Sequence, residues 1–188
     1  MKTLSLVHSI ELPFSGNLLK EAICVGDCDN DGFGEIVVGN TDGELFIYRS
    51  NKCIFYASDL GCISAISIGD LLNVSKNVIV VVTAEGWCHI FDVCDFETGF
   101  SSQNYMNQDK GDRDCFHHTS APPDAKSIIP FHSQRIVCNT KIVLLGDVNA
   151  DNCIEMVLSL TDRVVRTYRW KPERRPSIDQ VCFFRLTN

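Results

Sequence analysis

Residues 22–49 read AICVGDCDNDGFGEIVVGNTDGELFIYR, and this stretch decides the fold. A short apolar run ends at Gly26 and Asp27, and an acidic loop follows it. Two further runs, EIVVG and ELFIYR, flank a polar turn at 41–43. Short runs of Val, Ile and aromatic residues, separated by Asp, Asn and Gly, are typical of strands joined by hairpins. The stretch therefore predicts three consecutive strands.

The same pattern occurs twice more in the chain. Residues 65–92, AISIGDLLNVSKNVIVVVTAEGWCHIFD, and residues 142–169, IVLLGDVNADNCIEMVLSLTDRVVRTYR, align with the first unit without a gap. The first two units are 43 residues apart, which is the length of one four-stranded propeller blade. No segment has a convincing helical period. Because closed propellers contain four to eight blades, the repeats predict an all-β, partial and truncated β-propeller of about three blades.

The stretch between the second and third units is different in composition. It contains no Val, Ile or Leu over residues 95–126, so it cannot bury enough apolar surface to offset the entropy of ordering. The predicted layout is an outer strand at 3–14, a first blade at 22–58, a second blade at 62–93 with 127–133, a disordered insertion at 95–126, a third blade at 136–170, and the start of another blade at 171–188.

Composition excludes several classes of protein. The chain has 188 residues and a net charge of −7, and an acidic chain is poorly suited to neutralising nucleic-acid phosphates. It contains no run of 18 apolar residues, so no membrane span is predicted. Polar residues interrupt the apolar ones near the start, as Ser5 and Glu11 do, which argues against a secretory signal. We therefore expect a cytoplasmic protein whose ten cysteines are reduced, small apolar residues.

The loops after the first strand of each unit are candidate metal sites. Oxygen-bearing side chains recur at the first, third, fifth and ninth loop positions, a spacing that can surround a calcium ion. No such set exists in the second unit, where Leu72, Val74 and Val78 take the last three of these positions. The candidate ligands are Asp27, Asp29, Asp31 and Glu35 in the loop at 27–35, and Asp147, Asn149, Asp151 and Glu155 in the third unit.

A structural role for these loops competes with calcium binding. Asp, Asn and Gly also suit tight turns, because their side chains bond nearby backbone N–H groups and they tolerate left-handed conformations. We expect Asp27, Asp70 and Asp147 to close the turns. Extracellular calcium modules bind at about 10⁻⁴–10⁻³ M, so such a site would be mostly empty in the cytosol. No cofactor is therefore required, although Ca²⁺ at the loop 27–35 stays an open alternative.

The Gly-Asp loops, each followed by an apolar strand, resemble the FG-GAP repeats of integrin α-subunits. Residues 83–87 (TAEGW) and 161–166 (TDRVVR) are more specific, and with residues 13–16 (PFSG) they resemble the family of integrin-alpha FG-GAP repeat-containing protein 2. That resemblance implies a non-enzymatic scaffold subunit of the KICSTOR complex at the lysosomal surface. It also implies recruitment of the GATOR complex through the other subunits, and restraint of TOR kinase signalling on starvation.

Two other functions were weighed against this one. A calcium-dependent, integrin-like adhesion propeller is the alternative, and disulfide-bonded cysteines would favour it. An enzyme is not expected, because the sequence has no nucleophile elbow, phosphate loop or His-Glu-x-x-His motif, and the Cys and His residues at 115–118 fit no zinc-finger spacing. We predict that Trp87 and Phe91 belong to the core. The candidate partner contact is a basic rim of Arg163, Arg166 and Arg169.

Overall fold

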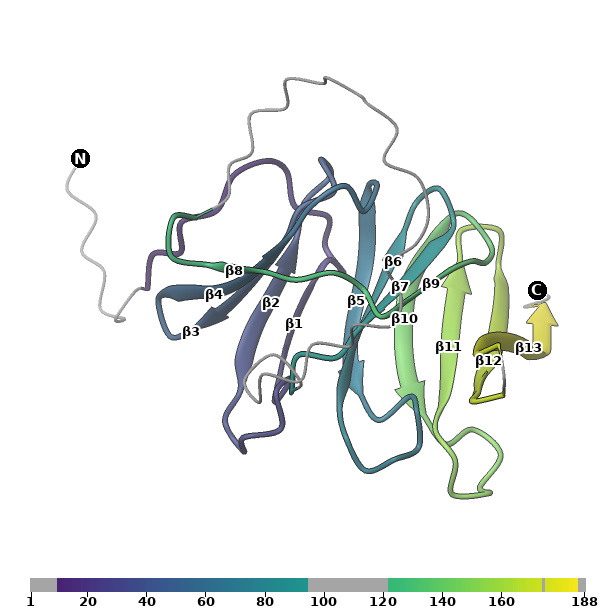
Figure 1. The fold of residues 1–188 in the computed structure, drawn as a ribbon. Helices are drawn as coiled ribbons and strands as arrows, with labels where there is room; N and C mark the ends of the chain where they lie inside the picture. The colour runs from purple at the N-terminus through teal and green to yellow at the C-terminus, as the bar shows by residue number, and fades with distance from the viewer. Residues whose placement is uncertain (1–9, 95–121, 174, 186–188) are drawn as a thin grey trace, which may run out of the picture.

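The computed structural model describes residues 10–94, 122–173 and 175–185, and over these ranges the chain folds into three β-sheets (Figure 1). The first sheet has the order β1 (Ile23–Gly26), β2 (Glu35–Gly39), β3 (Leu45–Arg49), β4 (Lys52–Ala57) and β8 (Lys126–Ser127). The second has the order β5 (Ile63–Gly69), β6 (Val78–Thr83), β7 (Trp87–Phe91) and β9 (His132–Arg135). The third has the order β10 (Thr140–Gly146), β11 (Glu155–Leu160), β12 (Val164–Lys171) and β13 (Ser177–Arg185).

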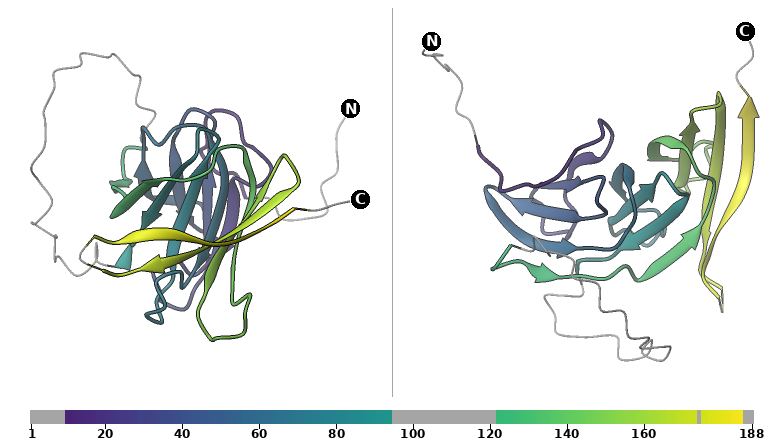
Figure 2. Two further views of the ribbon diagram at one scale, coloured as in Figure 1. Left: turned by 90° about the vertical axis from the view of Figure 1, so that its right-hand side faces the viewer. Right: turned by 90° about the horizontal axis from the view of Figure 1, so that it is seen from above.

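The sheets are arranged as successive blades. Seen from above, they stand side by side in an open fan (Figure 2). The first strand of each sheet contacts the first strand of the next, because β5 touches both β1 and β10. Neighbouring strands within each sheet are antiparallel, except that β8 pairs with β4 in parallel. The predicted all-β, partial β-propeller is therefore confirmed.

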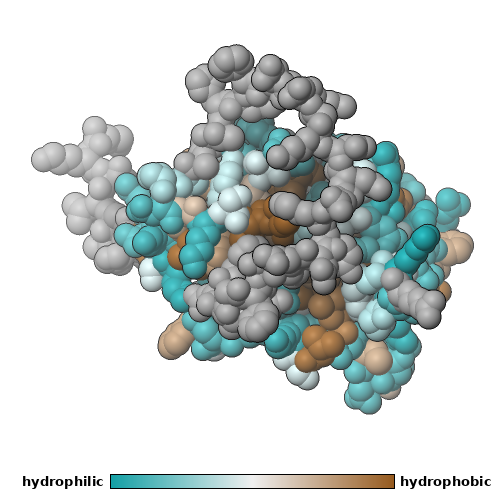
Figure 3. Space-filling view, viewed as in Figure 1, coloured by the Kyte–Doolittle hydropathy of each residue, from teal (hydrophilic) through white to brown (hydrophobic). Residues whose placement is uncertain are grey.

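Apolar contacts between neighbouring sheets form the core. One buried cluster joins the first and second sheets and includes Val37, Ile63 and Phe91. Another joins the second and third sheets and includes Val80 and Met156. Every residue of β6 is buried, because this strand is packed on both of its faces. Figure 3 shows the molecule from the same side as Figure 1, and the described residues on this side are mostly hydrophilic. A few hydrophobic patches lie among the hydrophilic residues.

Glycines allow this close approach of the sheets. A Cβ atom added at Gly39 would lie 2.6 Å from the buried side chain of Ile63 in the second sheet. A Cβ atom at Gly69 would lie 3.1 Å from Leu145 in the third sheet. At the equivalent Gly146, a Cβ atom would meet no described atom within 4 Å. The third sheet therefore has a neighbour on one side only within the described residues.

The outer strands differ from the predicted layout in two places. Residues 126–127 pair with β4 of the first sheet, and the outer strand of the second sheet is β9, at 132–135 rather than 127–133. The segment therefore crosses the outer edge of the first sheet before it reaches the second. Residues 177–185 pair with β12 along the whole strand, so this part of the predicted 171–188 segment completes the third sheet and does not begin another blade. The pairing of 126–127 with β4 joins residues distant in sequence, which local patterns do not specify. The pairing of β13 with β12 is a hairpin between consecutive strands.

The N-terminal segment also differs. Within the predicted strand at 3–14, residues 10–14 form no strand, and residues 3–9 lie outside the described ranges. Leu12 and Phe14 instead pack as irregular chain against the far face of the first sheet, where the hydroxyl of Tyr48 donates to the carbonyl oxygen of Pro13. Of the predicted insertion at 95–126, residues 95–121 lie outside the described ranges.

The glycine contacts give a stability test. We expect Gly39→Ala to lower the free energy of unfolding by about 1–3 kcal/mol, because the added methyl group overpacks the site against Ile63. Gly146→Ala is the matched control and should be neutral or stabilise by about 0.4–1 kcal/mol, because it only restricts the unfolded chain. Urea denaturation of both variants measures the difference. Equal effects would contradict the packing of the first sheet against the second.

Candidate functional site

The loops after the first strand of the three units lie at the same end of the sheets (Figure 1) and share one backbone conformation. Three residues after the first Asp, each loop has a residue with φ near +60°, namely Asn30, Asn73 and Ala150. Two residues further on, each loop has a second residue with positive φ, at Gly32, Ser75 and Asn152. The second loop lacks the other acidic side chains, so the conformation does not depend on them.

The first Asp of each loop holds this conformation. Asp27 accepts hydrogen bonds from the backbone N–H groups of Asp31 at 3.1 Å and Gly32 at 2.9 Å. Asp70 and Asp147 accept the same pair in their own loops, at 2.8–3.2 Å. The turn role predicted for these three residues is therefore confirmed. Their carboxylate oxygens are therefore already hydrogen-bonded to backbone N–H groups.

An asparagine joins each loop to the next. The side-chain amide of Asn30 donates to the carbonyl oxygen of Asn77 at 3.1 Å and accepts from its N–H at 2.7 Å. In the same way, the amide of Asn73 donates to the carbonyl oxygen of Ile154 at 3.3 Å and accepts from its N–H at 2.6 Å. Ala150 stands at the equivalent position of the third loop and has no amide. We call these paired bonds the asparagine clasps.

In the first loop, an arginine lies among the carboxylates. Arg49, the last residue of β3, forms ion pairs with Asp29, with Asp31 at 2.8 Å and with Glu35 at 3.1 Å. Glu35 is fully buried and also accepts from the N–H of Cys28 at 3.2 Å. Burial raises the pKa of Asp29, the negative charge of Glu35 raises it further, and Arg49 opposes both. The guanidinium thus supplies the positive charge that this cluster needs.

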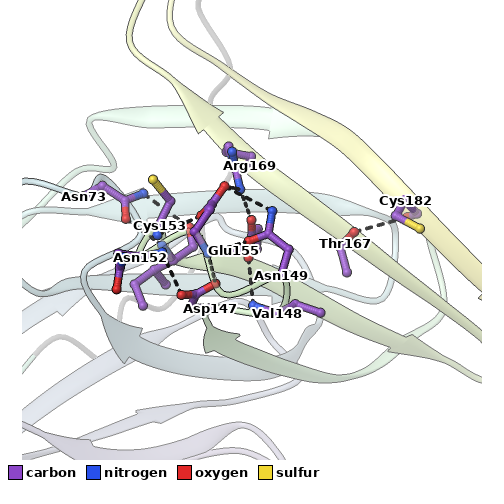
Figure 4. Close-up of polar contacts among 12 residues, drawn as sticks. Asn73, Asp147, Val148, Asn149, Asn152, Cys153, Glu155, Thr167, Arg169 and Cys182 are labelled. Carbon is purple, nitrogen blue, oxygen red and sulfur yellow. Dashed lines mark hydrogen bonds and ion pairs between the residues drawn. The ribbon is translucent and has the colours of Figure 1, made fainter.

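The third loop repeats the arrangement (Figure 4). Arg169, at the position equivalent to Arg49, pairs with Asp151 at 2.7 Å and with the buried Glu155. Glu155 also accepts from the N–H of Val148 at 3.0 Å. Hydrogen bonds from Arg169 and Asn149 lower the pKa of Asp151. The second unit has Asp92 instead of the arginine and Val78 instead of the glutamate, so the arginine occurs only with the acidic set among the three units.

The residues of the first loop could hold a metal ion only in competition with Arg49. Oxygens of Asp27, Asp29 and Glu35 lie within 4.8 Å of one another, and carboxylate oxygens are the ligands that calcium prefers. A cation there would have to displace the Arg49 guanidinium from Asp29 and Glu35. Calcium binding at 27–35, and at the corresponding set in the third unit, stays a prediction.

The predicted basic rim does not form one surface. Arg163 lies in the turn before β12, with φ of 65°. Arg166 and Arg169 are three residues apart on β12, and side chains at odd spacing on a strand point to opposite faces. Arg166 lies toward the second sheet, on the same face as the buried Tyr168, and Arg169 binds the acidic loop. Because alternate residues of a strand share a face, the sequence of β12 alone already places these two arginines on opposite faces.

The sequence patterns did not predict the asparagine clasps, and they placed Trp87 wrongly in the core. The asparagine clasps were missed, although the signal existed: the third position after the loop Asp is Asn in the first two units and Ala in the third. Trp87 was predicted in the core, but 37% of it is exposed, whereas Phe91 is buried as predicted. Trp87 is the first residue of β7, and its ring packs against the side chains of His89 and Arg135.

The repeated sheets, with Gly-Asp loops at one end, define a β-propeller with FG-GAP-type repeats. The sequence profile of integrin-alpha FG-GAP repeat-containing protein 2 matches residues 47–187, and the chain belongs to this family. The chain is 36% identical over 173 residues to the KICSTOR complex protein ITFG2 of Mus musculus, which covers 91% of this chain and 35% of that relative. The Bos taurus protein of the same name is also 36% identical, with 91% and 30% covered.

Among solved structures, the chain is similar to BBS1N in its complex with ARL6DN, in a crystal soaked with mercury. The TM-score is 0.42 with 10% identity, over 92% of this chain and 59% of that one. The same complex soaked with lead gives a TM-score of 0.39. The chain spans about a third of the length of the curated relatives it matches. Among the described residues, no helix is long and apolar enough to cross a membrane.

The asparagine clasps predict a measurable coupling between sheets. Asn73→Gly keeps the left-handed backbone accessible but removes both bonds to Ile154, so we expect unfolding free energy to fall by about 1–3 kcal/mol. Ala150→Gly, at the equivalent position with no clasp, should change stability little or raise it by about 1 kcal/mol. Thermal denaturation monitored by circular dichroism compares the two. Equal losses in both variants would show that the clasp contributes nothing.

The arginine in the first loop predicts a response to calcium. Arg49→Ala should lower the unfolding free energy by about 1.5–3 kcal/mol, because charge-assisted bonds to the buried Glu35 are lost. Millimolar CaCl₂ should then raise the melting temperature of this variant more than that of the unchanged chain, because Asp29 and Glu35 are released for the ion. Differential scanning calorimetry, with MgCl₂ as the comparison salt, measures both. A larger calcium response in the unchanged chain would show that Arg49 does not compete.

Proposed function

We propose that this chain is a non-enzymatic scaffold component of a KICSTOR-type complex. The observation that carries the proposal is its 36% identity to KICSTOR complex proteins over 91% of its length. In this proposal the chain contributes propeller surface to assembly with the other subunits at the lysosomal surface. Through them it takes part in recruiting the GATOR complex and in restraining TOR kinase signalling when nutrients are scarce.

The chemistry of the acidic loops supports a scaffold rather than an enzyme. Glu35 and Glu155 are buried, each is paired to an arginine, and each accepts a backbone N–H. A general acid or base must be within reach of its substrate and must exchange a proton near the working pH. Carboxylates held in internal ion pairs and backbone hydrogen bonds are not available for that role.

Affinity capture from cells tests this function. The tagged chain is expressed in amino-acid-starved cells, and captured proteins are identified by mass spectrometry beside the full-length mouse relative. We expect the other KICSTOR subunits with both baits. A Val80→Asp variant, which places a charge in the fully buried β6, serves as the unfolded control. Proteins captured equally by that variant are discounted as nonspecific.

The possible outcomes distinguish an assembly surface on these three sheets from one on the remaining length of the full-length relative. Recovery of KICSTOR subunits by this chain, and not by its Val80→Asp variant, supports the proposal. Recovery by the full-length relative alone would contradict it for this chain. Phosphorylation of TOR kinase substrates during starvation gives the second readout, and it should be higher in cells that lack the chain and restored by its expression.

A further inference from the structure

The two ends of the fan of sheets carry the two halves of one repeated contact. Inside the chain, a glycine of one sheet meets an aliphatic side chain of the next sheet. A Cβ atom at Gly26 would lie 3.5 Å from the Cβ atom of Ile68. A Cβ atom at Gly69 would lie 3.5 Å from the Cβ atom of Leu145. Because a Cβ atom at Gly146 would meet no described atom within 4 Å, the third sheet presents the glycine half of this contact without a described partner.

The first sheet presents the aliphatic half of the same contact. Val25 precedes the Gly-Asp pair of its unit, at the position that Ile68 and Leu145 occupy in theirs. The preceding sheet partly buries Ile68 and Leu145, whereas 68% of Val25 is exposed. Ile23 lies on the same face of β1 and is 44% exposed, although the equivalent residues of β5 and β10 are buried. This face of β1 therefore has the apolar side chains of an inter-sheet contact but is not covered.

The open face of the third sheet differs from the inner sheets in the same way. Val148 follows Gly146 by two residues and is 53% exposed, whereas the equivalent Cys28 and Leu71 are buried in the clusters between sheets. Leu144 shares a strand face with Gly146 and is also exposed. Both ends of the fan are therefore apolar at positions where the inner sheets are covered.

The irregular N-terminal segment covers only part of the first-sheet face. Leu12 and Phe14 pack with Phe46 and Tyr48 of β3, and β1 lies at the opposite edge of the sheet, beyond β2. Neighbouring sheets inside the chain meet through their first strands, since β5 contacts both β1 and β10. The strands that one more contact of this kind requires, β1 and β10, thus lie at the two ends of the fan (Figure 2).

Two copies of this chain have the number of sheets that a closed propeller needs. Closed propellers contain about four to eight blades, and the described residues of one chain form three sheets. Two copies together have six sheets, whereas a single copy has too few and three copies have too many. Head-to-tail contacts form a ring when their rotation closes, so both open faces of each copy are covered in such a pair.

From this repetition we infer that two copies of this chain associate head to tail into one closed ring, with β1 of each copy packed on β10 of the other. Val25 of one copy then meets Gly146 of the other, which repeats the glycine contacts inside each copy. Burial of the apolar side chains on both faces drives the association. No asparagine clasp forms across this contact, because Ala150 stands at the clasp position of the third loop. The inference does not depend on the proposed scaffold function.

Sedimentation equilibrium of the whole chain measures the association. One chain has a mass of 21.0 kDa, and we expect twice that mass at about 50 µM, which requires a dissociation constant of about 10 µM or lower. Val25→Asp and Leu144→Asp each place a charge in the contact and should raise the dissociation constant about a hundredfold or more. Ile129→Asp is the matched control and should leave the mass unchanged, because Ile129 is 72% exposed and lies between β8 and β9, outside both open faces.

Disulfide cross-linking tests which faces meet. The Cβ–Cβ distance of 3.5 Å at both inner contacts is within the range of a disulfide. A Val25→Cys chain is mixed with a differently tagged Gly146→Cys chain, and mild oxidation should join them into a covalent pair. Ile129→Cys mixed with Gly146→Cys controls for the ten cysteines of the chain itself, and it should give about tenfold less of the mixed pair.

Three results would overturn the inference. An unchanged chain that stays at 21.0 kDa at about 50 µM would leave the two faces to a sheet of another protein. A Val25→Asp chain that dimerises as tightly as the unchanged chain would exclude the first sheet from the contact. Equal cross-linking of the Val25→Cys mixture and its control would show that Val25 and Gly146 do not meet.

Folding is checked so that each variant stays informative. Val25, Leu144 and Ile129 are exposed, so each Asp variant should keep the circular dichroism spectrum of the unchanged chain. If an Asp variant unfolds, cross-linking decides, because Cys is small and apolar and the Cβ position of Gly146 is open. Dimerisation without capture of KICSTOR subunits would refute the proposed function but support the ring, and capture by a monomer would do the reverse.

Discussion

Apolar packing between neighbouring sheets is the interaction on which the rest of the structure depends. Each sheet has only four or five short strands, and its apolar faces must be covered by another layer to be removed from water. Stacking buries both faces of the second sheet, and β6 is buried at every residue as a result. Gly39 and Gly69 permit the required approach, because a side chain at either position would meet the next sheet. The loops are held in place by this stacking.

The acidic loops are a variation on one turn rather than three separate designs. Two left-handed positions and one aspartate fix the backbone in all three units. On that frame, the first and third units add a buried glutamate that is neutralised by an arginine from the third strand of the sheet. The second unit replaces the glutamate with Val78 and keeps the fold. The cost of burying a carboxylate is thus offset within each sheet by a cation from the same sheet.

Polar side chains then fix how neighbouring sheets sit against each other. Asn30 and Asn73 bond the backbone of the following loop, and Gln134 bonds the backbone of β13 near the outer strands. Each contact satisfies a backbone N–H and carbonyl pair at the seam. Directional bonds of this kind specify a register that apolar packing alone leaves open.

The sequence by itself determined the strands, their order within each repeat and the turn role of Asp27, Asp70 and Asp147, because these depend on residues close together in the chain. Only the tertiary structure decided that 177–185 completes the third sheet, that 126–127 crosses to the first, and that Arg49 lies among the acidic ligands. The crossing of 126–127 depends on pairing between segments far apart in the chain. The other two outcomes depend on which neighbouring strand or loop a segment meets in the folded sheet, and local residue patterns specify neither.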